Sequence, residues 1–174
     1  IIYADPPWLY KDKSKSHGGG AEAHYKCTST DELKNISIPA EDNSVLLMWA
    51  TYPMLEEALS LMGAWGFKFK TVAFTWVKSN KDGSVYMGMG RHTRANAEIC
   101  LLGTRGKGLT RKNAGIYNTQ IHNRGRHSEK PQKFRDDIVR LYGDVSRLEM
   151  FARQKTEGWD VWGNEVESDI ELSY

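Results

Sequence analysis

The feature that most limits the possible folds is an unbroken run of six apolar residues at positions 45–50 (VLLMWA). A strand of this composition suits a sheet that is covered on both faces, because every side chain then needs an apolar neighbour. Further strands are predicted where short runs are apolar or rich in β-branched and aromatic residues. These runs are 1–4, 71–77, 99–102, 148–152 and, as an edge strand, 159–162.

Helical patterns alternate with these strands. The three predicted helices cover 30–33, 54–62 and 131–142. Thr30 is the expected N-cap of the first, Pro53 fits the first turn of the second, and glycines at 63 and 143 are expected to end the second and third. This alternation predicts an α/β fold with a mostly parallel sheet flanked by helices and joined by right-handed crossovers.

Length and composition favour one domain over residues 1–174, since 40% of the chain is hydrophobic and 26% is charged. Apolar content is too high for a disordered chain, and no run approaches the roughly 20 apolar residues of a membrane span. Two cysteines without CxxC spacing favour a reducing compartment, and the histidines show no metal-ligand spacing, so we expect no metal site. Flexible loops are expected at 11–24 and 103–128, a hairpin turn at 88–90, and a loose tail at 166–174.

The chemistry of the chain centres on Asp5-Pro6-Pro7-Trp8, which directly follows the first predicted strand. Ligands of open α/β sheets bind beyond the carboxyl ends of the strands, so Asp5 is a candidate site residue. The two prolines stiffen the backbone and remove two N–H donors, which leaves only acceptors. A carboxylate, a carbonyl and the flat ring of Trp8 suit a planar base with an exocyclic amino group. The alternative is a Pro-rich turn with a packed tryptophan.

A strand followed by Asp-Pro-Pro-Trp resembles motif IV of S-adenosylmethionine-dependent amino-methyltransferases. The remaining landmarks resemble the MT-A70 family of N6-adenine methyltransferases, in order and along nearly the whole chain. These landmarks are Tyr25 with the segment 27–33, the segment 94–103 (RANAEICLLG), the segment 128–131 (SEKP), and the segments 147–153 and 158–165.

The resemblance implies a Rossmann-like methyltransferase fold with a permuted order, in which the catalytic motif precedes the cofactor strand at 148–152. It also implies S-adenosylmethionine as cofactor. The residues expected to hold it are Asp5, Lys130, Phe151, Arg153, Asn164 and Glu165. A cation at Lys130 suits the anionic methionine end of that ligand. No GxGxxG motif follows an early strand, and the alternative for Arg153 and Asn164 is a strand-end cap and turn.

The predicted catalytic set is Asp5, Pro6, Pro7 and Trp8. The adenine amine is a poor nucleophile because its lone pair is delocalised into the ring. We hypothesise that Asp5 and the Pro6 carbonyl accept its two N–H bonds, and that positioning and electrostatics dominate the catalysis. Trp8 and Tyr25 would stack on the base. A base inside a duplex cannot reach such a pocket, so base flipping or a single-stranded substrate is implied.

A one-sided charge distribution favours a polyanionic partner. Residues 99–128 contain no Asp or Glu, and lysines near position 13 form a second basic patch. Both suit phosphate contacts, which give affinity without sequence choice. The predicted substrate-binding residues are Lys11, Lys13, Tyr25, Arg94, Arg105, Lys107, Arg124 and Arg126. The alternative for the basic run is a solvated surface loop.

These features together predict a methyltransferase that acts on the N6 amine of adenine in nucleic acid. DNA is favoured over RNA on a family-level argument, because compact relatives resemble prokaryotic or phage DNA modifiers. The alternatives are the same reaction on RNA adenosine, an inactive nucleic-acid-binding partner subunit, and a methyltransferase of small-molecule or protein amines. A homodimer or heterodimer is compatible with the resemblance, and the expected location is the cytoplasm, or the nucleus of a eukaryote, without membrane association.

Overall fold

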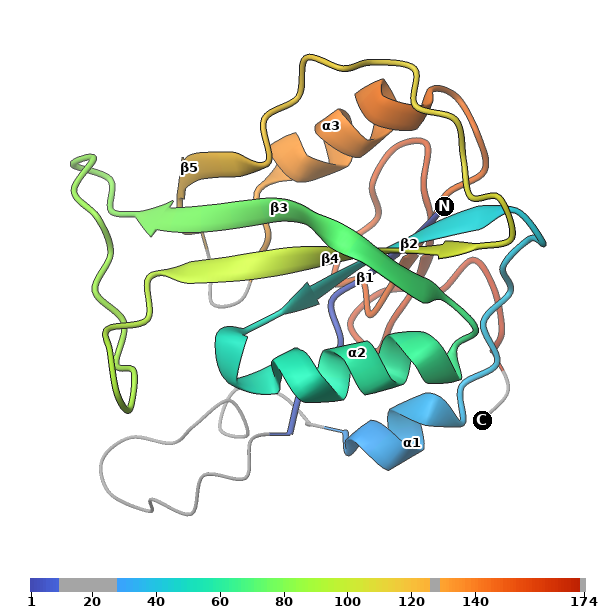
Figure 1. Cartoon of the computed structure of the whole chain (residues 1–174), viewed down its shortest axis with the longest axis horizontal. Coiled ribbons are helices and arrows are strands. Elements are labelled where there is room, and N and C mark those ends of the chain that lie inside the picture. The colour runs from blue at the N-terminus through green and yellow to red at the C-terminus, as the bar shows by residue number, and fades with distance from the viewer. Residues whose placement is uncertain (10–27, 126–128, 173–174) are drawn as a thin grey trace.

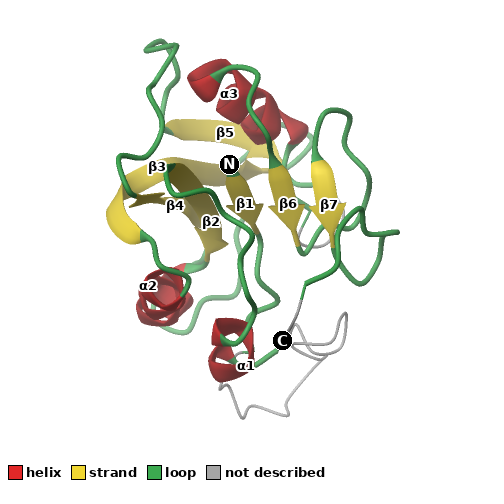
Figure 2. Ribbon diagram, turned by 90° about the vertical axis from the view of Figure 1, so that its right-hand side faces the viewer, coloured by secondary structure: helices red, strands yellow, loops and turns green. Residues whose placement is uncertain are grey.

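The computed structural model describes residues 1–9, 28–125 and 129–172, and within them seven strands form one sheet in the order β5-β3-β4-β2-β1-β6-β7 (Figure 2). The strands are β1 (Ile2–Ala4), β2 (Ser44–Ala50), β3 (Lys68–Ser79), β4 (Ala97–Arg105), β5 (Thr119–Asn123), β6 (Leu148–Met150) and β7 (Asp160–Trp162). Four of the six neighbouring pairs are parallel, and the two pairs that contain β4 are antiparallel. The prediction of a mostly parallel α/β fold is confirmed.

Helices cover both faces of this sheet. Helices α1 (Thr30–Lys34) and α2 (Leu55–Ala64) lie on one face, and α3 (Gln132–Tyr142) lies on the other (Figures 1 and 2). Alternate side chains of β2 point to opposite faces, so Leu46 and Met48 join the core under α1 and α2, whereas Leu47 and Trp49 join the core under α3. Two covered faces explain why β2 is apolar at every position. None of the helices in the described ranges is long and apolar enough to cross a membrane.

Some local predictions were wrong in detail. The N-cap of α1 is Ser29 rather than Thr30, because Ser29 and Glu32 form a reciprocal capping box. Gly63 lies inside α2, and the left-handed residue that follows this helix is Gly66, with φ 79°. The segment 103–128 was predicted to be a loop, but it contains the end of β4 and all of β5. Strand β5 is an edge strand whose one apolar residue, Ile121, is exposed, so hydrophobic patterning does not detect it.

The direction of the strands decides which loops share one edge of the sheet. Strand β4 runs opposite to its two neighbours, and every other pair is parallel, so the carboxyl ends of β1, β2, β3, β5, β6 and β7 lie at the same edge. We call it the carboxyl edge. Asp5 follows β1 at this edge, Lys130 follows β5, and Phe151 follows β6. The carboxyl end of β4 lies at the opposite edge.

Candidate active site

The segment from Asp5 to Trp8 is held rigidly at the carboxyl edge. The Trp8 N–H donates to the Pro6 carbonyl at 2.9 Å, and the Thr28 N–H donates to the Pro7 carbonyl at 3.0 Å. The Trp8 side chain is 4% exposed, and its indole N–H donates to the Trp49 carbonyl at 3.2 Å. The ring therefore lies in the core and anchors the turn, and its stacking on a base stays a prediction.

The carboxylate of Asp5 belongs to a chain of alternating charges. Lys130 Nζ lies 2.6 Å from Asp5 Oδ2 and 3.1 Å from Glu98 Oε2, and its side chain is 3% exposed. Glu98 also accepts a hydrogen bond from Lys78 on β3. Among the described residues, no hydrogen bond reaches Asp5 Oδ1, and the Asp5 side chain is 25% exposed. One oxygen of Asp5 is thus fixed, and the other can accept from a ligand.

Burial and charge set the protonation of this chain. Burial raises the pKa of Asp5, and the neighbouring Glu98 carboxylate raises it further, against the opposite effect of Lys130. Burial alone would raise the pKa of Glu98, but the ammonium groups of Lys130 and Lys78 outweigh it and lower that pKa. Burial alone would lower the pKa of Lys130, but the two carboxylates outweigh it, so its pKa lies above the usual range. Lys130 is therefore a permanent cation.

A second buried ion pair lies beside this chain. Arg135 of α3 donates to both oxygens of Glu149 on β6, at 2.7 and 2.5 Å. The same guanidinium donates to the Lys130 carbonyl at 3.3 Å and lies 5.5 Å from the centre of the Tyr3 ring. A bidentate pair of this kind orients both partners. Arg135 thereby connects helix α3 with Lys130 and with strand β6.

A cavity of about 160 Å³ opens next to Asp5. Its lining combines three cations, several carboxylates and two aromatic rings. The lining residues are Tyr3, Asp5, Glu129, Lys130, Arg135, Glu149, Phe151, Arg153, Gln154 and Glu165. A mixed lining of both charges and flat rings fits a ligand with a carboxylate, two cationic centres, sugar hydroxyls and a base. The volume suits one end of such a ligand, since complete small-molecule sites measure roughly 300–1,000 Å³.

The cofactor residues predicted from the resemblance largely come together here. Lys130, Phe151, Arg153 and Glu165 all line the cavity. Arg153 Nε lies 3.6 Å from Glu165 Oε1 in a partly exposed pair, and Asn164 is exposed beside it. Contact of these side chains with a cofactor remains a prediction. Lys130 differs from its expected role, because its ammonium already binds Asp5 and Glu98 rather than pointing to the cavity alone.

The turns after β6 and β7 show strain and close contact. Phe151 has φ 61°, a left-handed conformation that a bulky residue rarely adopts. Its ring lies 6.5 Å from Trp65, nearly parallel to it, and 5.3 Å from Trp162. A Cβ at Gly163 would lie 2.1 Å from the Ala152 carbonyl oxygen, so only glycine fits there. The turn after β6 is therefore formed by a left-handed phenylalanine that packs against two tryptophans, and not by a glycine-rich loop.

The predicted substrate-binding residues fall into three groups. Arg94 and Arg124 lie at the carboxyl edge, the former between β3 and β4 and the latter directly after β5. Arg105 and Lys107 lie at the opposite edge, near the start of β2. Arg105 donates to the Ala40 and Trp65 carbonyls at 2.8 and 2.6 Å, so it stabilises the fold, and its substrate role stays a prediction. Lys11, Lys13, Tyr25 and Arg126 lie outside the described residues.

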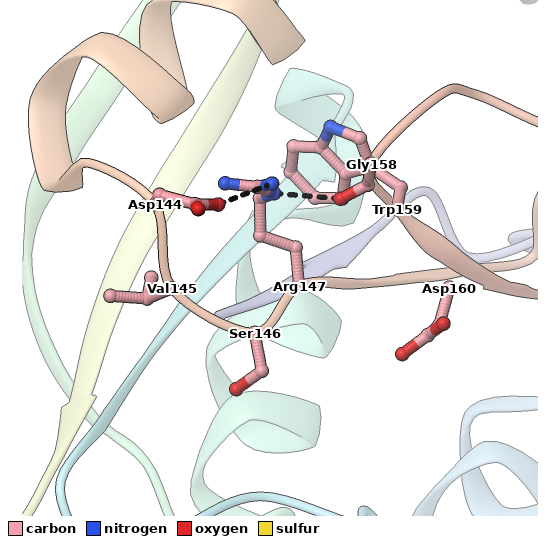
Figure 3. Close-up of a pocket in the computed structure, with 7 residues that line it drawn as sticks. All are labelled: Asp144, Val145, Ser146, Arg147, Gly158, Trp159 and Asp160. Carbon is pink, nitrogen blue, oxygen red and sulfur yellow. Dashed lines mark hydrogen bonds and ion pairs between the residues drawn. The ribbon is translucent and has the colours of Figure 1, made fainter.

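A larger cavity of about 530 Å³ lies far from this chemistry (Figure 3). It is lined by 144–147, which precede β6, and by 158–160, which lead into the first residue of β7, so it lies at the edge opposite Asp5. Figure 3 shows Arg147 between Asp144 and the Gly158 carbonyl, to which it donates at 3.2 and 2.9 Å. The Arg147 guanidinium therefore stabilises the segments that precede β6 and β7.

Sequence reasoning did not assign roles to Lys78, Glu98, Arg135 and Glu149. The signal available for the two glutamates is a charged residue beside or within a short apolar strand, at Glu98 before ICLL and at Glu149 within LEM. A charge that is almost never buried alone implies a buried partner in the fold. The identity of the partners, Lys130 and Arg135, follows only from the packing of distant segments.

The order and placement of these residues define a methyltransferase of the Asp-Pro-Pro-Trp type. Residues 1–165 match the MT-A70 family model, and the chain belongs to this family of methyltransferases. It is 36% identical over 193 residues to the type II methyltransferase M.MunI of Mycoplasma sp, across 99% of this chain and 80% of that protein.

Two further relatives match over 95% of this chain. The N6-methyladenosine RNA methyltransferase MTA1 of Cryphonectria parasitica is 28% identical, and 51% of its length is covered. The human N(6)-adenine-specific methyltransferase METTL4 is 26% identical, and 37% of its length is covered. The chain thus spans about half the length of these two relatives or less. The family expected from the motif resemblance is confirmed.

Proposed function

We propose that this chain transfers a methyl group from S-adenosylmethionine to the N6 amine of adenine in DNA. The observation that carries the proposal is Asp5, rigidly held by a Pro-Pro turn at the carboxyl edge, with one carboxylate oxygen available beside a cavity of mixed charge. Relatives named as acting on N6 of adenine support the acceptor atom.

S-adenosylmethionine, when bound, supplies a methyl group already activated by its sulfonium centre. The residues of the chain then have two tasks, which are to hold the cofactor and to position the acceptor. We assign to Arg153, Asn164 and Glu165 the sugar hydroxyls and to Phe151 the flat base of the cofactor. Lys130 lines the cavity with a positive charge that suits the carboxylate end of the ligand, although its ammonium also binds Asp5 and Glu98.

Asp5 and Pro6 position the adenine amine. Asp5 Oδ1 accepts one N–H of the amine, and the Pro6 carbonyl, which keeps a second lone pair beside its bond to the Trp8 N–H, accepts the other. Two acceptors localise the nitrogen lone pair and point it toward the cavity. Lys130 holds Asp5 Oδ2, so that the carboxylate keeps its orientation without reorganisation during the reaction. The proton released after transfer passes to Asp5 or to water.

The substitution Asp5→Ala tests this assignment. We expect a loss of methyl transfer of at least about a hundredfold, the scale of removing one preorganised polar group from a catalytic site. The assay uses labelled cofactor with DNA and RNA oligonucleotides, followed by analysis of the nucleosides. Asp31→Ala is the matched control, because the Asp31 side chain is 95% exposed on α1. Thermal unfolding of both variants monitors the fold, and retained turnover in Asp5→Ala would refute the role of Asp5.

The preference for DNA is the finer part of the proposal. This chain is 36% identical to the type II methyltransferase and 28% identical to the RNA methyltransferase MTA1. It also covers 80% of the length of the former and 51% of the length of the latter. In the same assay, N6-methyladenine is expected as a deoxynucleoside from the DNA oligonucleotide. Methylation of the RNA alone would retain the reaction and overturn the choice of DNA.

A further inference from the structure

The segment 80–96, which joins β3 to β4, forms a defined hairpin that projects from the carboxyl edge (Figure 1). The Tyr86 N–H donates to the Lys78 carbonyl at 2.9 Å, and Gly88 and Ala95 exchange backbone hydrogen bonds at 2.9 and 3.2 Å. A Cβ at Gly88 would lie 2.1 Å from the Ala95 carbonyl oxygen. The conformation of the hairpin is therefore fixed by close contact between the backbones of Gly88 and Ala95.

The surface of the 80–96 hairpin carries apolar and basic side chains together. Met89 is 86% exposed and Met87 is 66% exposed. Lys81, Arg91 and Arg94 are exposed cations, opposed by the single acid Asp82. The Arg94 guanidinium lies 3.8 Å from Met89 Sδ, so a cation stands directly beside the most exposed apolar side chain. Exposed apolar groups on a defined projection indicate a contact surface.

We propose that the 80–96 hairpin enters the DNA duplex beside the target adenine, with Met89 filling the space that the extruded base leaves. This inference rests on the proposed function. An adenine in a duplex must leave the stack to reach Asp5, and methionine is among the apolar residues that proteins insert between base steps. The hairpin and Asp5 share the carboxyl edge, so one bound duplex can meet both.

Charge favours DNA over a protein as the occupant. Arg91 and Arg94 follow Met89 by two and five positions, and cations beside a wedge can bind the phosphates of the opened step. Arg124, at the end of β5, lies 4.1 Å from the Tyr86 ring, which brings another cation to the base of the hairpin. An apolar side chain at Met89 with arginines near it therefore suits DNA, which combines stacked bases with anionic phosphates.

A wedge matters only when the base must be removed from a pair. The variant Met89→Ala should lower kcat/KM about tenfold on a duplex in which the target adenine is paired with thymine. It should change kcat/KM less than about twofold when the same adenine is opposite an abasic site or in a single strand, where the unstacking cost is small. Met89→Leu keeps an apolar wedge and should restore most of the activity on the paired duplex.

Phe69→Ala is the matched control, because Phe69 is also exposed but lies at the start of β3, at the opposite edge. Equal activity of Met89→Ala and wild type on the paired duplex, or an equal loss on all three substrates, would overturn the wedge and leave the proposed function intact. An unchanged rate with a smaller species in sedimentation would assign the hairpin to a protein interface and overturn it too. Inactivity of the wild-type chain on DNA and RNA would instead overturn the proposed function, and the wedge with it.

Discussion

The ion pair between Arg135 and Glu149 offers a sharp test of how this site is built. Both side chains are buried, and they share two hydrogen bonds at 2.7 and 2.5 Å. The substitution Arg135→Met removes the cation and leaves the Glu149 carboxylate in the core. Breaking a buried pair in this way costs about 3–5 kcal/mol, because the remaining charge has lost both water and its partner.

The expected loss is large enough to measure by two methods. For a domain of 150–250 residues, each kcal/mol corresponds to roughly 2–4 °C, so Arg135→Met should lower Tm by about 6–20 °C. Urea denaturation should give the same loss in the free energy of unfolding from the shift of the midpoint. Gln132→Met is a suitable control on α3, because Gln132 is exposed and its hydrogen-bond partner Asp136 is exposed as well.

Removing both partners separates charge from packing. The double variant Arg135→Met with Glu149→Leu removes the unpaired carboxylate, so it should recover most of the stability lost in Arg135→Met. It should still bind the cofactor more weakly, because Arg135 also donates to the Lys130 carbonyl. A loss below about 1 kcal/mol in Arg135→Met, or no recovery in the double variant, would refute the reasoning, since exposed pairs have energies of that size.

Two further predictions concern the same site. Because the pKa of Asp5 is raised, its carboxylate protonates at a higher pH than an ordinary Asp, and the acidic limb of log kcat/KM should lie above the usual Asp range. Glu98→Gln removes the carboxylate that repels Asp5, so it should move this limb to lower pH. A limb that does not move would contradict the coupling between Glu98 and Asp5. Gly163→Ala places a Cβ 2.1 Å from the Ala152 carbonyl oxygen, which should lower the free energy of unfolding by about 1–3 kcal/mol. Calorimetry should also show weaker cofactor binding. Wild-type stability and affinity in this variant would show that the turns after β6 and β7 do not need this close contact.

Local patterns predicted the elements where one residue type dominates. The apolar run of β2 and the stripe of α3 were found because burial on a covered sheet selects such side chains at every position concerned. Strand β5 was missed because four of its five residues are polar and its pairing with β3 depends on the backbone. The hydrogen bonds of Arg105 and Trp8 to distant carbonyls could not be predicted for a similar reason: a charge or a ring outside a clear pattern does not reveal which edge or core it faces.

The amino-acid sequence by itself determined the fold class, the family and the Asp-Pro-Pro-Trp turn, because these depend on residue types at short spacing. Only the tertiary structure decided that Lys130, 125 positions from Asp5, holds that carboxylate, and that Arg135 pairs with Glu149. It also decided which basic residues share an edge with Asp5, since β4 alone among the described strands reverses direction. Pairing of buried charges is a long-range requirement: the sequence shows the charges, and the packing of the sheet and α3 selects the partners.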